Sequence, residues 1–113
     1  MAKDEKFMME FICFSAKETI SNLKKNKNDD PSFKVIEDII KRYNVNKEGA
    51  WSLYRPIFWH LSDQNVIRFE NSSWNLHPEY QNPSKDMLNK LVNGVLHSYR
   101  DTLSARLEKY YDN

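Results

Sequence analysis

Few side chains in this sequence have the types and spacings that support acid–base or metal chemistry. The three histidines, His60, His77 and His97, are far apart, and no H-x-x-x-H or H-E-x-x-H spacing brings two of them onto one helix face. A metal site would depend on the tertiary fold alone, so each histidine is interpreted as a surface residue or a hydrogen-bonded core residue. We expect no metal and no other cofactor.

Nucleophilic and carboxylate chemistry has no better support. The single cysteine, Cys13, lies beside an apolar helical stripe with no helix N-terminus to activate it, which indicates a buried, unreactive thiol. Neighbouring carboxylates at 29–30 and 37–38 would, on a helix, point about 100° apart and would not converge on a substrate. The sequence therefore predicts a protein that is not an enzyme.

The composition describes one small domain that can bury a core. Of its 113 residues 40% are hydrophobic and 13% aromatic, and the formal net charge is only +1. Gly49 and Gly94 stand far apart, which excludes the glycine-rich phosphate loops of nucleotide-binding folds. One cysteine allows no internal disulfide, and no apolar run reaches membrane length. We therefore expect a single domain over 1–113 in a cytoplasmic protein that does not contact a membrane. The many Asn and Lys residues indicate that the source is a low-GC bacterium, a phage or a mobile element.

Hydrophobic periodicity predicts four helices and one short hairpin. The helical spacing of apolar residues covers 4–25, 32–43, 52–63 and 85–111, and β-rich runs at 66–70 and 74–76 surround turn residues at 71–73. Asn46 can cap a helical turn that begins at Lys47, and Ser84 can cap the last helix. The fold class is therefore mainly α with a small β-hairpin.

The order of three helices, a hairpin and a further helix resembles a winged helix-turn-helix domain. Asn65 stands where glycine is usual in that fold, and asparagine tolerates the left-handed conformation that ends a helix. The resemblance covers 32–78, between an N-terminal helix at 4–25 and a long C-terminal helix at 84–112. About four extra residues at 47–50 depart from the pattern and lengthen the turn between the second and third helices. The residues that carry the resemblance are Tyr54, Phe58, Leu61, Asn65, Val66 and Ile67.

The resemblance implies a regulator of transcription or replication that binds double-stranded DNA. Its third helix would enter the major groove and its hairpin would contact the DNA backbone. Arg55 could read guanine, whereas Leu53, Pro56 and Trp59, which are also expected to face outward, fit DNA poorly. The candidate binding residues are Lys47, Ser52, Arg55, Trp59, His60, Arg68, Asn71, Ser72 and Ser73.

The charge of this region leaves a second function open. Between 46 and 77 three cationic residues are matched by three carboxylates, whereas a DNA-binding surface usually has a basic excess. The region also concentrates aromatic residues, which are interpreted mainly as core, but Trp59 falls on the polar side of its helix and is expected to be exposed. The alternative to DNA binding is a winged-helix module that binds a protein partner, as an adaptor or inhibitor.

The C-terminal helix is longer than a small core requires. At 1.5 Å per residue it would extend roughly 40 Å, so we expect part of it to contact a second chain in a homodimer. The alternative is that the first and last helices complete the core of the monomer. Gly94, in the middle of this helix, indicates a close helix crossing. The residues assigned to the dimer interface are Leu96, Tyr99, Leu103, Leu107 and Tyr110.

Overall fold

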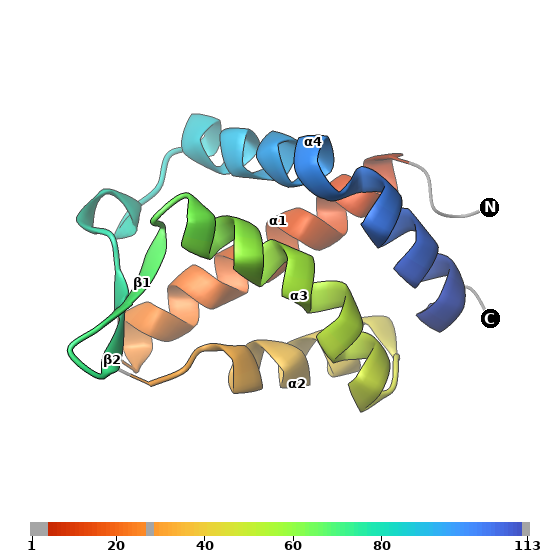
Figure 1. The fold of residues 1–113 in the computed structure, drawn as a ribbon, viewed down its shortest axis with the longest axis horizontal. Helices are drawn as coiled ribbons and strands as arrows, with labels where there is room; N and C mark the ends of the chain where they lie inside the picture. The colour runs from red at the N-terminus through yellow and green to blue at the C-terminus, as the bar shows by residue number, and fades with distance from the viewer. Residues whose placement is uncertain (1–4, 27–28, 112–113) are drawn as a thin grey trace.

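The computed structural model describes residues 5–26 and 29–111, which form helices and one hairpin (Figure 1). This confirms the mainly α class, and in general shape the arrangement is compatible with a winged helix. The expected helix start at residue 4 and the expected end of the C-terminal segment at residue 112 lie outside the described ranges. Within those ranges, no helix is long and apolar enough to cross a bilayer. The elements are α1 (Glu5–Lys25), α2 (Ser32–Tyr43), α3 (Lys47–Asp63), β1 (Ile67–Glu70), β2 (Ser73–Leu76), the 3₁₀ turn η1 (Pro78–Tyr80) and α4 (Lys85–Tyr110).

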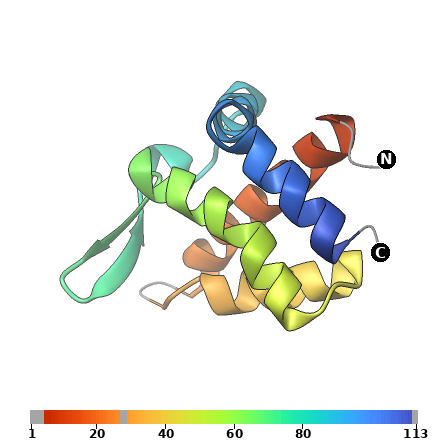
Figure 2. The ribbon, with the colours of Figure 1, turned by 45° about the vertical axis from the view of Figure 1, so that its right-hand side comes forward.

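Helix α3 lies at the centre of the molecule and packs against α1, α2 and α4 (Figures 1 and 2). Its core side carries Leu53, Tyr54, Ile57 and Leu61, each no more than 1% exposed. These side chains belong to the same core as the apolar stripe of α1, which has the helical spacing that the sequence predicts. Only a narrow part of α3 is left facing solvent.

The turn between α2 and α3 is short. Asn44 ends α2 in the left-handed conformation, with φ 54° and its N–H donated to the Ile40 carbonyl. The Asn46 side chain accepts a hydrogen bond from the Gly49 N–H at 2.7 Å, which confirms the predicted cap. The expected helix start at residue 52 is wrong, because 47–50 form the first turn of α3. The predicted longer turn is therefore also wrong: residues 44–46 alone join the two helices.

The hairpin follows α3 through a residue in the left-handed conformation. Asn65 has φ 59°, as the resemblance requires at this position. In the antiparallel pair Glu70 lies opposite Ser73, so the loop consists of Asn71 and Ser72, both with positive φ. Positive φ at both positions is typical of a type I′ turn, whose twist matches that of paired strands. Ser73 belongs to β2 rather than to the turn, and the hairpin projects away from the helices (Figure 2).

Helix α4 begins at its predicted cap and bends once. The Ser84 hydroxyl accepts a hydrogen bond from the Met87 N–H at 3.2 Å. At Tyr99 the backbone leaves helical geometry, with φ −132° and ψ 19°, and nothing in the sequence indicates this bend. The close crossing expected at Gly94 is present, and its neighbour is His60 of α3 in the same chain.

The residues assigned to a dimer interface face neighbours in their own chain. Tyr99 packs against Trp59 with ring centroids 6.2 Å apart, and the Tyr110 hydroxyl donates to a Glu48 carboxylate at 3.4 Å. The predicted dimer contact is wrong for the other three, which are at most 3% exposed in the monomer core: Leu96, Leu103 and Leu107. The bend in α4 explains this, because it keeps the long helix against α1 and α3.

Candidate binding face

Helix α3 exposes one narrow stripe between its neighbours. Trp51, Arg55 and Trp59 follow each other at four-residue spacing, which places them in line along one side of a helix. Arg55 and Trp59 are exposed and Trp51 is half-buried. The structure therefore brings together two of the predicted binding residues, Arg55 and Trp59, with a second aromatic residue, Trp51, that the sequence analysis assigned mainly to the core.

Three other residues of α3 that were expected to face outward are buried. Leu53 has no exposed surface, Pro56 is buried, and His60 is only 8% exposed. The prediction is wrong for these residues because other helices cover most of the circumference of α3, and α4 covers the side that carries His60. The periodicity of one helix shows which of its sides is most apolar, but it does not show how many of its other sides are covered by neighbouring elements.

Ser52 is half-buried, and its backbone joins α3 to α4. Pro56 has no N–H, so the Ser52 carbonyl, four residues earlier, lacks its helical partner. The guanidinium of Arg106 in α4 takes that place and donates to the Ser52 oxygen at 2.7 Å. This bond satisfies a partly buried carbonyl and fixes a cationic side chain beside the exposed stripe.

The N-terminal part of the stripe meets α2. Phe33 is 63% exposed and packs edge-on against Trp51, with ring centroids 5.5 Å apart and planes at 83°. The Arg55 guanidinium lies 5.8 Å from the centre of the Trp51 ring, within cation–π range. Sequence reasoning missed Phe33, since its spacing places it on the apolar side of its helix and nothing in the sequence indicates its exposure.

Trp59 is 44% exposed, which confirms the predicted exposure of this side chain. Its ring lies 6.2 Å from that of Tyr99, and the Arg106 guanidinium lies 6.0 Å from the indole centre. Two side chains of α4 therefore hold the indole in place while much of its surface faces solvent. A large side chain that is already fixed loses little conformational entropy on binding.

The hairpin adds a second exposed aromatic group. Phe69 is 60% exposed and packs on Trp74 at a centroid distance of 5.3 Å, and Trp74 packs on Phe58 of α3 at 5.1 Å. Arg68, a predicted contact residue, forms an ion pair with Glu70 at 2.6 Å, so its charge is matched within the hairpin. We define the α3 face as the surface formed by Phe33, Trp51, Arg55, Trp59, Phe69 and Trp74.

Free positive charge around the α3 face is limited. Lys47, at the start of α3, is exposed, and neither it nor Arg55 forms an ion pair with another residue that the structure describes. The remaining predicted residues, Asn71 and Ser72, are exposed at the hairpin tip, while Ser73 is half-buried. The candidate face is therefore aromatic with two free cations, rather than basic.

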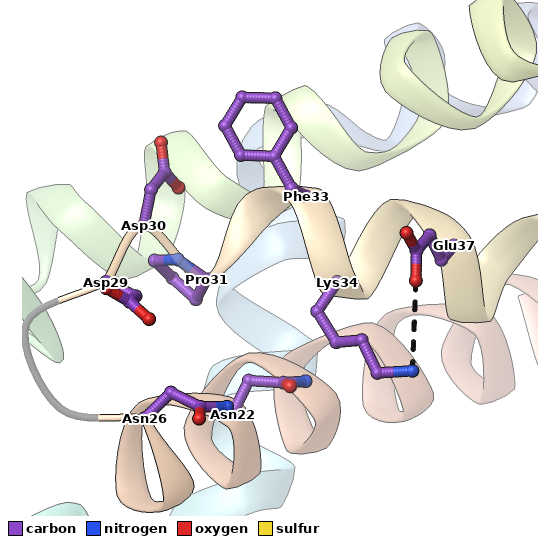
Figure 3. A pocket seen from close by; sticks show the side chains of 8 residues that line it. All are labelled: Asn22, Asn26, Asp29, Asp30, Pro31, Phe33, Lys34 and Glu37. Carbon is purple, nitrogen blue, oxygen red and sulfur yellow. Dashed lines mark ion pairs between the residues drawn. The ribbon is translucent and has the colours of Figure 1, made fainter.

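A hollow of about 240 Å³ lies between the end of α1 and the start of α2 (Figure 3). Its charged groups serve the fold, since Asp30 accepts a hydrogen bond from the Ser32 N–H at 2.8 Å and Lys34 forms an ion pair with Asp38 at 3.0 Å. Figure 3 shows Phe33 on the opposite side of α2 from Lys34. In 5–26 and 29–111 no group of three or more His, Cys, Asp or Glu side chains is placed to hold a metal ion.

Comparisons with protein-family models, with curated proteins and with solved structures found no match. The candidate site therefore rests on the geometry of this chain: a line of aromatic and cationic side chains on α3, which Phe33 extends onto α2. The hairpin pair Trp74 and Phe69 joins α3 through Phe58.

Proposed function

We propose that this chain is a winged-helix module that binds a protein partner through the α3 face. The observation that supports the proposal is the position of the exposed apolar surface. Among the described residues, the exposed large hydrophobic side chains are Met9, Phe33, Trp59 and Phe69, and all but Met9 belong to this face. Apolar surface concentrated on one side of a small protein is typical of an interaction site.

The residue types of the α3 face also favour a protein partner. Tryptophan and arginine are enriched at the energetic centres of protein interfaces, and Trp51, Arg55 and Trp59 stand in one line on a single helix. Trp59 is held by two residues of α4, so it is already in position to enter a pocket. We expect the partner to offer an apolar pocket for Trp59 and a carboxylate within reach of Arg55.

Double-stranded DNA is the second candidate, and one observation favours it. The turn of residues 44–46 between α2 and α3 is short, as in helix-turn-helix proteins, and it leaves Lys47 and Arg55 exposed on the helix that would enter the major groove. With about two phosphate contacts per chain, a plot of the logarithm of the binding constant against the logarithm of the salt concentration would have a slope of only about −2. Binding of this kind would be weak, and its affinity would depend only modestly on salt concentration.

The protein-binding proposal is tested by partner capture from extracts of the source cells with immobilised variants. Trp59→Ala should lower the affinity for the captured partner by at least about 2 kcal/mol, which is roughly thirtyfold. Met9→Ala is the matched control, since it removes an exposed apolar side chain outside the α3 face. A partner that is retained equally by wild type, Trp59→Ala and Met9→Ala would contradict the proposal.

The DNA candidate is tested by fluorescence anisotropy with mixed-sequence duplexes at low and moderate salt. If DNA is the ligand, Lys47→Ala and Arg55→Ala should each weaken binding, and Lys17→Ala, which removes an exposed charge of α1, should not. Absence of binding even at low salt excludes DNA. Binding that Arg55→Ala abolishes and Trp59→Ala leaves intact would favour DNA over a protein partner.

A further inference from the structure

A cleft of about 400 Å³ opens beside α3, between α4 and η1. Its volume lies in the range of sites that hold small molecules. The cleft shares no residue with the α3 face, so it is a separate candidate site. Its polar lining comes from α3, the segment after it, η1 and α4, and comprises His60, Gln64, Tyr80, Lys90, His97 and Ser98.

His60 lies in the wall of this cleft, and its imidazole forms no hydrogen bond with another described residue. It is 8% exposed, and its Nε2 atom lies 2.5 Å from where a Cβ atom on Gly94 would be. Desolvation lowers the pKa of the imidazole, an effect that the nearby Asp63 carboxylate opposes only in part, so the ring is neutral at neutral pH. Because the imidazole lines the cleft and has no partner among the described residues, it is available to hydrogen-bond a ligand there.

The α4 side of the cleft supplies positive charge. Lys90, Gly94 and His97 lie at spacings of four and three residues, which places them on one side of the helix. Lys90 forms no ion pair within 5–26 and 29–111, and the described lining contains no Asp or Glu. The cleft therefore offers hydrogen-bond donors and an ammonium group, and the nearby Asp63 carboxylate is not part of its described lining.

We propose that this cleft binds a small phosphate ester. Lys90 would act as a point charge on the phosphate, and His97 and Ser98 would donate hydrogen bonds from the same helix. Lysine is a common phosphate ligand that acts through its charge alone, and no arginine occurs in the described lining. A bare phosphate ion would leave most of the cleft empty, whereas Leu91 and Tyr80 provide an apolar wall for the organic part of an ester.

The proposal is tested by titrating the protein with phenyl phosphate, inorganic phosphate and benzoate, and recording backbone amide NMR spectra. Phenyl phosphate should cause saturable shifts at the amides of His60, Gly94 and His97. Inorganic phosphate should shift the same amides with lower affinity, and benzoate should bind most weakly. Absence of saturable shifts at these amides, or tighter binding of benzoate than of phenyl phosphate, would overturn the proposal.

Matched lysine variants separate a specific site from general attraction of anions. Lys90→Gln should weaken phenyl phosphate binding about tenfold, the loss expected for one charge-assisted hydrogen bond. Lys85→Gln removes the same charge from α4 outside the cleft and should leave binding unchanged. An equal loss in both variants would overturn the proposal. The Trp59→Ala variant should bind phenyl phosphate with the affinity of the wild type. The proposal for this cleft and the proposal for the α3 face can therefore be refuted independently of each other.

Discussion

A buried hydrogen bond between Thr19 of α1 and Tyr54 of α3 gives a quantitative test of how the central helix is held. The two hydroxyl oxygens lie 2.6 Å apart, and both residues are at most 1% exposed. The Thr19 hydroxyl also donates to the Ser15 carbonyl at 2.8 Å. Because a threonine has one hydroxyl proton, Tyr54 must be the donor in the bond between the two helices.

The assignment of the donor predicts unequal effects of the two single substitutions. Thr19→Val leaves the Tyr54 hydroxyl buried without an acceptor and should destabilise the protein by about 1–3 kcal/mol. Tyr54→Phe removes the donor but leaves Thr19 bonded to Ser15, so the expected loss is nearer 1 kcal/mol. The double variant has neither polar group and should be no less stable than Thr19→Val.

Urea and thermal unfolding of the four proteins measure this cycle. For a protein of about this length, a change of 1 kcal/mol in the free energy of unfolding shifts Tm by roughly 4 °C. The losses in free energy of unfolding of the two single variants should add to more than the loss of the double variant. Strict additivity, or a larger loss for Tyr54→Phe than for Thr19→Val, would refute the assigned donor and the role of this bond between α1 and α3.

Because the Tyr54 hydroxyl is buried, we expect the stability of the protein to depend on pH in the alkaline range. Burial raises the pKa of Tyr54, because the charged phenolate would lose its hydration inside the core. Since the folded state favours the neutral phenol, the contribution of Tyr54 to stability is complete below the unfolded pKa of about 10 and is lost as pH rises above it. Tyr54→Phe should lose stability less steeply above this pH than the wild type does, as measured by urea unfolding.

Substitutions at three further positions test local features of α3 and its neighbours by thermal unfolding. Asn46→Ala should cost about 1 kcal/mol because it removes the acceptor that caps α3, and Asn46→Asp should retain most of the stability. Asn65→Gly should keep or raise stability while Asn65→Ala lowers it by about 1 kcal/mol, since φ is 59° at this position. Arg106→Met should destabilise by about 1–3 kcal/mol, because it leaves the Ser52 carbonyl without a donor; no change would contradict that role.

The features that the sequence predicted well are those set by chemistry within a few residues. Asn46 and Ser84 bond to N–H groups three residues later, and Asn65 adopts a backbone conformation that few other residues tolerate. The apolar stripe of α1 is likewise a property of one helix. Each of these signals can be read without knowing which elements pack together.

The start of α3 shows why other features could not be predicted. The missing N–H of Pro56 favours a helix that begins just before it, yet α3 begins at Lys47. The structure resolves this conflict through Arg106, which supplies the Ser52 carbonyl with a donor from 54 residues further along the chain. No local pattern contains that compensation, and the bend at Tyr99 that brings α4 onto α3 is equally invisible in the sequence.

Helix α4 also bears on the choice between the two candidate ligands. The major groove is about 12 Å wide and admits a single helix, which is itself about 10–12 Å across with its side chains. Tyr99 and Arg106 of α4 both touch Trp59, so the surface around the exposed stripe is wider than α3 alone. Phe33 widens it on the α2 side. We infer that this broad aromatic surface suits the face of another protein better than a groove, and that any contact with DNA would have to come from Lys47, Arg55 and the hairpin tip.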